Sequence, residues 1–423
     1  MQNHAHVRVL TCERERKSTV ARAQGVPPHT PLAPLRHRHA IHHRSYRAMP
    51  KPSLACIGQD RAAELGWPTS NTLGAAGRDA ARMAAMEKVD FEAQERALQG
   101  RAAKFRASTA APGSKHQVVN KVVDLFSDGV RMSGTIWRPE NAPPDKQLLP
   151  AILLCHGWGG KRAHLDFSYA PKFAAAGFVV LTFDYRGWGE SDGVVVAAEA
   201  QPKPEPGGDG TVSMRVRVVR KVIDPEWQLR DVDSALNYLL YAVPGVDISR
   251  VGIWGSSFGG GHALATGARD SRIKCIVCQI GSINTHANWI NRHPQYRGAP
   301  AIHRLAAEQA QGITFPWTLQ MPAGLDGAPN LPKVVFEHTD KTISSLDRIQ
   351  APTLILAAEK EELFRNEQNS ELVYERLKGR VPAQLDYLPG GHYDAYGNPA
   401  YGKGLQLATD WFKLYLSNPD PKL

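Results

Sequence analysis

A glycine-rich turn carries the residue in this chain best suited to covalent chemistry. The pentapeptide GSSFG (255–259) follows the apolar segment 251–254 and precedes a run of small residues that begins at Gly260. This GxSxG spacing predicts a sharp turn from a strand into a helix, which exposes the central serine at the helix N-terminus. Glycines flank it because larger side chains would collide in so tight a turn. Ser257 is therefore a candidate nucleophile, although ordinary strand-to-helix turns share the pattern.

Two later segments could supply the acid and the base that a serine nucleophile needs. The apolar run 352–358 predicts a strand that ends in the carboxylate cluster 359–362, and 383–388 predicts a strand that leads into the loop around His392. Serine, acid and histidine thus follow one another in the order found in α/β-hydrolases. We expect His392 to be the general base, oriented by one of these carboxylates. The alternatives are a loop histidine with a structural hydrogen bond and carboxylates that are merely solvated, as we expect for Glu359 and Glu362.

A glycine-rich loop upstream could hold a developing negative charge. Residues 151–155 predict a buried strand that opens into the sequence HGWGG (156–160). Glycines let such a loop approach a substrate carbonyl closely, and backbone N–H groups then stabilise the oxyanion. We expect the amides of Trp158 and Phe258 to be these donors. His156 is expected to be structural and to hold the loop by hydrogen bonds.

Taken together, the motifs resemble one branch of the α/β-hydrolases, which contains dienelactone hydrolases, acetyl esterases and the catalytic domain of Xaa-Pro dipeptidyl-peptidases. The shared motifs are HGWGG, DYRGWGESDG (184–193), the GxSxG turn and GHYD (391–394). The resemblance covers residues 117–420, and its Asp-Tyr-Arg-Gly segment is the most branch-specific part. It implies an α/β-hydrolase fold and a serine, histidine and acid triad that works through an acyl-enzyme.

One position departs from that branch, which usually has aspartate where this chain has Glu361. Glutamate carries the same charge on a longer side chain, so Glu361 is the expected acid and Glu362 the competing one. In the motif that starts at Asp184, we expect Asp184 and Asp192 to brace the loop and Arg186 to pair with one of them.

The strand and helix patterns predict the α/β class. From the third strand onward, helical segments separate the strand candidates, which implies parallel strands joined by crossovers. The fold class is therefore an α/β-hydrolase fold, a mostly parallel eight-stranded sheet flanked by helices, with a cap inserted between strands six and seven. The clearest helix begins at Glu226 and carries Leu229, Val232, Leu236 and Leu239 on one face. The strand candidates are 118–126, 131–137, 151–155, 178–183, 251–254, 274–279, 353–358 and 383–388.

Composition divides the 423 residues into three parts. Residues 1–85 hold 13 lysines and arginines against 5 acidic residues, which accounts for +8 of the net charge of +10. We expect a disordered basic tail there, so the basic pI is poor support for nucleic-acid binding. Residues 86–116 predict a helix and linker that dock on the domain or on a second copy of the chain, and 117–423 predict the hydrolase domain.

Two insertions interrupt this domain. Residues 194–224 predict a loop followed by a basic alternation that could form a short hairpin, and 283–345 predict the cap. Trp289 and Trp317 in the cap could line a substrate pocket, or they could form the cap's own small core together with Tyr296 and Phe315.

The five cysteines do not suggest a disulfide framework. Cys275 and Cys278 should face opposite sides of a strand, which argues against a shared metal or redox role. No export signal or membrane span is evident in the sequence, so a cytoplasmic location is the default.

The leading interpretation is a serine hydrolase of small carboxylic esters. It implies no cofactor and no metal, a small-molecule substrate, and neither nucleic-acid nor membrane partners. The alternatives are a peptidase or amidase of the dipeptidyl-peptidase type, a polyketide-type acyltransferase, and a binding protein that has lost its activity.

Overall fold

The computed structural model describes residues 117–417, apart from 146, 205–206, 293–298 and 320–326. The predicted tail (1–85) and the predicted N-terminal helix (86–116) lie outside these residues, as does Tyr296.

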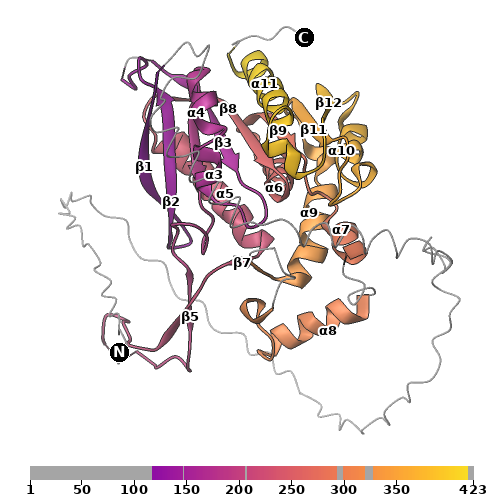
Figure 1. Cartoon of the computed structure of the whole chain (residues 1–423). Helices are drawn as coiled ribbons and strands as arrows, with labels where there is room; N and C mark the ends of the chain where they lie inside the picture. The colour runs from indigo at the N-terminus through magenta and orange to yellow at the C-terminus, as the bar shows by residue number, and fades with distance from the viewer. Residues whose placement is uncertain (1–116, 146, 205–206, 293–298, 320–326, 418–423) are drawn as a thin grey trace, which may run out of the picture. The chain divides into compact units, whose positions relative to one another are not determined.

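Eight strands form the central sheet, in the order β1-β2-β4-β3-β8-β9-β11-β12 (Figure 1). Strand β2 pairs antiparallel with β1 and β4, and the remaining pairs are parallel. The bounds are β1 Val118–Ser127, β2 Val130–Pro139, β3 Leu149–Cys155, β4 Val179–Phe183, β8 Val246–Ser256, β9 Ile273–Gln279, β11 Thr353–Ala358 and β12 Ala383–Leu388. The predicted α/β-hydrolase fold and all eight strand candidates are confirmed. Strand β8 begins five residues before the prediction because its first half is polar and partly exposed.

Helices cover both faces of this sheet, so three of its inner strands are buried throughout. Every residue of β3, β4 and β11 is buried, as expected for parallel strands packed on both sides. One face packs against α4 and α11, and the other against α5, α6 and α10. Cys278 belongs to one of these cores and Cys275 to the other, which confirms that they face opposite sides. The helices are α3 Arg162–Asp166, α4 Ala170–Ala175, α5 Pro225–Tyr241, α6 Phe258–Arg269, α10 Ser370–Leu377 and α11 Ala400–Phe412.

Helix α5 confirms the clearest helix prediction. Asp224 caps it by accepting hydrogen bonds from the amides of Glu226 and Trp227 at 3.1 and 3.2 Å, and Pro225 occupies the first helical position, where no N–H is required. The four apolar side chains that predicted its inner face are all buried.

The first insertion contains a two-stranded antiparallel ribbon, β5 (Val194–Ala197) and β6 (Val216–Val219). The basic alternation therefore does form a strand, but its partner lies before the predicted loop. A short strand that follows, β7 (Val222–Ile223), pairs with β10 (Ala328–Pro329) and so links this insertion to the second one.

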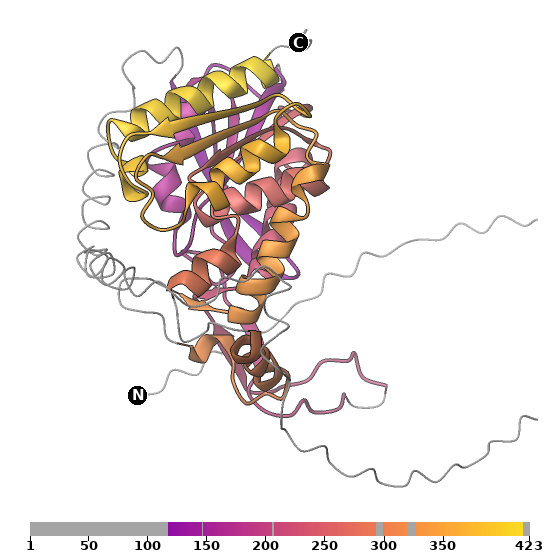
Figure 2. The same ribbon diagram turned by 90° about the vertical axis from the view of Figure 1, so that its right-hand side faces the viewer.

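The second insertion lies between β9 and β11, beyond the end of the sheet where β8 and β9 finish (Figures 1 and 2). It contains α7 (Thr285–Arg292), α8 (Ala299–Ala310), η3 (Pro316–Thr318), η4 (Lys333–Glu337), α9 (His338–Ile343) and η5 (Leu346–Arg348). Its role as a cap remains a prediction. Among the described helices, none is both long and apolar enough to serve as a membrane span.

Candidate active site

The turn between β8 and α6 holds Ser257 in a strained backbone conformation. Its φ of 55° and ψ of −123° lie outside the regions that side-chain-bearing residues usually occupy. A Cβ at position 255 would collide with the carbonyl of Gly259, and one at position 259 would collide with the carbonyl of Cys155. Both glycines are therefore sterically required, as the sequence predicted.

Neighbouring backbone groups hold this strained serine in place. The amide of Ser257 donates to the carbonyl of Gln279 at 2.9 Å, and its own carbonyl accepts from the amides of Gly260 and Ser282, both at 2.9 Å. Strain of this kind persists only where the surroundings over-determine the conformation. The position of Ser257 is thus fixed by β9 and the segment that follows it.

Three predicted site residues, from three different loops, meet at the carboxyl ends of β8, β11 and β12. His392 Nε2 lies 3.0 Å from Ser257 Oγ, and His392 Nδ1 lies 2.9 Å from Glu361 Oε2. The side chains of His392 and Glu361 are each only 2% exposed. Because a carboxylate only accepts, Nδ1 carries the proton and donates to Glu361. Nε2 is left to accept a proton from the serine hydroxyl.

The two adjacent glutamates make different contacts with the same histidine. Glu361 bonds the imidazole and also accepts from the amide of Leu363 at 2.9 Å, whereas Glu362 accepts from the backbone amide of His392 at 2.6 Å. The structure therefore places Glu361, rather than Glu362, as the partner of the ring. The expectation that Glu362 is merely solvated is wrong, because the loop of His392 folds back onto it.

The glycine-rich loop after β3 packs directly against the nucleophile. A Cβ at position 157 would lie 3.0 Å from both the Cβ of Ser257 and the carbonyl oxygen of Ser256, so a larger residue would crowd the nucleophile. The loop thereby brings Trp158 against Phe258, with ring centroids 5.3 Å apart. The role of these two backbone amides as oxyanion donors remains a prediction.

Aromatic side chains form one wall beside Ser257. Trp289 on α7 packs on Trp158 at 5.7 Å between centroids, so the second insertion reaches the loop next to the nucleophile. Trp317 instead stacks on Phe315 at 4.6 Å, in a segment that contacts β10. Of the two predicted pocket residues, the structure thus brings Trp289 to the site and joins Trp317 to a neighbour within its own insertion.

His156 is buried beneath the loop and supports it, as expected. Its Nδ1 lies 3.1 Å from the carbonyl of Gly157, and its ring packs edge-on against Tyr185 at 4.4 Å. Burial lowers the pKa of His156 from 6.5 to about 4, so the ring is neutral at pH 7.

This buried imidazole predicts a loss of stability in mild acid. As the pH falls below 6.5, the unfolded chain binds a proton at His156, whereas the folded chain does so only near pH 4. The contribution of His156 to the free energy of unfolding is therefore fully present above pH 6.5 and is lost as the pH falls from 6.5 to 4. Between pH 7 and pH 5 the free energy of unfolding should fall by about 2 kcal/mol. Urea unfolding at both values should show this loss in the wild type and a smaller one in His156→Gln. Equal losses in the two proteins would contradict the assignment.

The loop after β4 is braced by Asp184, as predicted, but Arg186 has other partners. Asp184 accepts from the backbone amides of Arg162 and Glu190 at 2.7 and 3.1 Å. The guanidinium of Arg186 instead bonds the fully buried carboxylate of Asp231 on α5, with Nε at 2.8 Å. The predicted pairing of Arg186 with Asp184 or Asp192 is wrong.

The carboxylate of Asp231 lies 45 positions after Arg186 in the sequence, so no local pattern reveals this ion pair. The other loop acid, Asp192, pairs with Arg131 on β2 at 2.8 Å.

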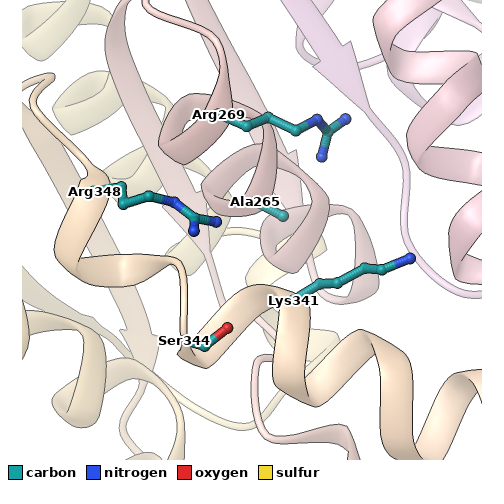
Figure 3. A pocket seen from close by; sticks show the side chains of 5 residues that line it. All are labelled: Ala265, Arg269, Lys341, Ser344 and Arg348. Atoms are coloured by element: carbon teal, nitrogen blue, oxygen red, sulfur yellow. The ribbon is translucent and has the colours of Figure 1, made fainter.

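A hollow of about 230 Å³ lies toward the opposite end of α6 from Ser257 (Figure 3). It is lined by Ala265, Arg269, Lys341, Ser344 and Arg348. Arg269 also pairs with Asp233 on α5 at 2.6 Å. None of the lining residues is a carboxylate or an imidazole, so this hollow lacks the acid and the base that acyl transfer requires.

The strand order and the strained serine between β8 and α6 define the class of fold: the chain has an α/β-hydrolase fold. Residues 128–314, less than half of the chain, match the family model of X-Pro dipeptidyl-peptidase (S15 family), so the chain is similar to that branch of the α/β-hydrolases over this range. The resemblance inferred from the sequence motifs is thereby confirmed.

Three known proteins show how far this similarity extends. A solved structure of a hypothetical protein from Pseudomonas aeruginosa has the same fold, with a TM-score of 0.51 and 18% identity over 73% of this chain and 96% of that one. An uncharacterized 31.7 kDa protein of Escherichia coli, from the traX-finO intergenic region, is 27% identical over 288 residues, which cover 63% of this chain and 91% of the relative. Quorum-quenching protein AidA of Acinetobacter baumannii is 34% identical over 157 residues, which cover 37% of this chain and 42% of AidA.

Proposed function

We propose that this protein is a serine hydrolase that cleaves carboxylic esters through an acyl-enzyme intermediate. The observation that carries the proposal is the buried relay in which His392 lies 3.0 Å from the hydroxyl of Ser257 and 2.9 Å from the carboxylate of Glu361. A nucleophile bonded to a base, and a base oriented by a third group, is the arrangement that activates serine.

In the first half-reaction, His392 Nε2 takes the proton of Ser257 as Oγ attacks the acyl carbonyl carbon. The C–O double-bond electrons move to the carbonyl oxygen, which the amides of Trp158 and Phe258 would stabilise as an oxyanion. Glu361 stays ionised and stabilises the imidazolium. When the tetrahedral intermediate collapses, His392 returns the proton to the leaving alkoxide, and the acyl group remains on Ser257.

In the second half-reaction, water replaces the alcohol. His392 takes a proton from a water molecule as its oxygen attacks the acyl carbon, and the same two amides hold the second oxyanion. Collapse expels the oxygen of Ser257, which regains its proton from His392. The product acid leaves, and Glu361 keeps the imidazole in the correct tautomer throughout.

The surroundings of Ser257 favour an ester with an apolar acyl group over a peptide with a free amino terminus. Several of the described side chains near the site are aromatic: Trp158 packs against Phe258 and Trp289, and Phe364 packs edge-on against His392 at 5.0 Å. Dipeptidyl-peptidases usually anchor the substrate amine with acidic groups. The nearby glutamates, 361 and 362, are instead engaged with His392.

The family-model match keeps a peptidase as the second candidate. The two candidates separate in a simple assay: we expect hydrolysis of p-nitrophenyl acetate and butyrate, and none of aminoacyl-proline anilides. Cleavage of the anilides with kcat/KM equal to or above that of the esters would overturn the ester assignment in favour of the peptidase.

A further inference from the structure

A chain of hydrogen bonds connects the loop of His392 to the residue before the nucleophile; it begins at Tyr396, which is 40% exposed, and runs into the buried interior. The hydroxyl of Tyr396 lies 2.8 Å from the hydroxyl of Ser256. The side-chain amide of Gln279 lies 3.5 Å from the same oxygen of Ser256 and donates to the hydroxyl of Tyr169 at 2.9 Å. Ser256, Gln279 and Tyr169 are all at most 2% exposed.

The first bond of this chain, between Tyr396 and Ser256, lies between the two segments that carry the reacting groups. Tyr396 closes the short helix η7 (Tyr393–Tyr396), which begins directly after His392. Ser256 directly precedes Ser257, and the main-chain carbonyl of Gln279 accepts the amide of Ser257. The Tyr396–Ser256 bond therefore joins the segment that carries the base to the strand that carries the nucleophile, across 140 positions of sequence.

The distance between Ser257 Oγ and His392 Nε2 depends on how these two segments are held. Glu361 fixes the rotation of the imidazole, and Glu362 fixes the backbone amide of His392, but both glutamates belong to the β11 side of the site. Tyr396 provides a side-chain contact from the His392 segment to the nucleophile strand. We propose that Tyr396 and Ser256 are positioning residues that set the separation of Ser257 and His392, a role that rests on the proposed function.

The chemistry of the bond suits this task. Burial of the hydroxyl raises the pKa of Tyr396 well above its usual value, so the phenol stays neutral across the pH range in which the site would work. The hydroxyl of Ser256, a residue only 2% exposed, would retain the full cost of desolvation if it lost this partner. The bond should consequently persist throughout turnover, and its removal should loosen the Ser257–His392 contact without touching either side chain.

The test compares Tyr396→Phe, Ser256→Ala and the double variant with the wild type on p-nitrophenyl butyrate. Because small errors in the placement of a catalytic group are costly, each single variant should lose about tenfold in kcat with KM within about twofold. The double variant should be no slower than the slower single variant, because both changes remove the same contact. Tyr401→Phe is the matched control and should leave kcat unchanged. Tyr401 lies in α11, the helix that follows η7, and its hydroxyl donates to the carbonyl of Ser168 at 3.0 Å.

A Tyr396→Phe variant with wild-type kcat overturns the proposal while ester hydrolysis by the wild type stands. Losses in the two single variants that multiply in the double variant would also overturn it, since they would show two independent effects. Thermal unfolding of each variant completes the test, because a lowered Tm with unchanged kcat would show a purely structural contact. If the wild type neither hydrolyses esters nor reacts with a fluorophosphonate, the proposed function fails and this proposal fails with it.

Discussion

Ser257→Ala is expected to lower kcat for p-nitrophenyl butyrate by about 10⁶-fold, to the small rate enhancement that substrate binding and the oxyanion donors provide without a nucleophile. The variant keeps its fold because the change removes one hydroxyl from a turn that backbone hydrogen bonds hold. Binding should survive, so KM should change far less than kcat. Steady-state kinetics on protein free of contaminating esterase measures the loss.

His392→Ala is the companion to that experiment, because residues of a triad act as a unit. We expect a similar loss in each single variant and little further loss in the Ser257→Ala/His392→Ala double variant. Arg348→Gln, in the hollow toward the far end of α6, is the control and should retain wild-type rates. A Ser257→Ala variant within tenfold of the wild type would show that another residue carries the reaction.

Glu361→Gln should lower kcat by about 10³- to 10⁴-fold, whereas Glu362→Gln should lower it by about tenfold or less. The amide of a glutamine at 361 can offer its NH₂ to the ring, which favours the wrong imidazole tautomer and removes the charge that stabilises the imidazolium. At 362 the partner is the backbone amide of His392, and a glutamine oxygen still accepts that hydrogen bond.

This pair of isosteric changes tests the two glutamates against each other at adjacent positions. The kcat of each variant, measured at saturating ester, is the readout, and circular dichroism confirms that the variants fold. A larger loss in Glu362→Gln than in Glu361→Gln would contradict the assignment of the acid and restore Glu362 as the candidate.

The sequence predicts the sheet and points to three side chains that lie within hydrogen-bond distance, Ser257, His392 and Glu361, because both leave local signals. Strand β3 is apolar throughout, and the turn at Ser257 demands glycines at 255 and 259 for steric reasons that the structure confirms. Chain order then points to His392 and to the carboxylates after β11. Strand β8 is underestimated because its first five residues include polar, partly exposed side chains that interrupt the apolar pattern.

The interactions that sequence reasoning missed are contacts between polar groups far apart in the chain. Arg186 donates a hydrogen bond to Asp231 on α5, and Glu362 accepts one from the backbone amide of His392. The hydroxyl of Tyr396 forms a hydrogen bond with that of Ser256. Nothing in the spacing of these residues reveals such a partner, because each contact depends on how loops fold over the end of the sheet. The fold class can be predicted from the periodicity of the sequence, whereas the polar contacts that hold the site residues in place are seen only in the structure.

The most direct test of the central claim, that His392 activates Ser257 as a covalent nucleophile, is mass spectrometry of the full-length protein after reaction with a fluorophosphonate probe. The account predicts one adduct, located by peptide sequencing at Ser257, and a greatly reduced labelling rate in His392→Ala. A folded wild-type protein that remains unlabelled, or that carries the adduct on another residue, would contradict it.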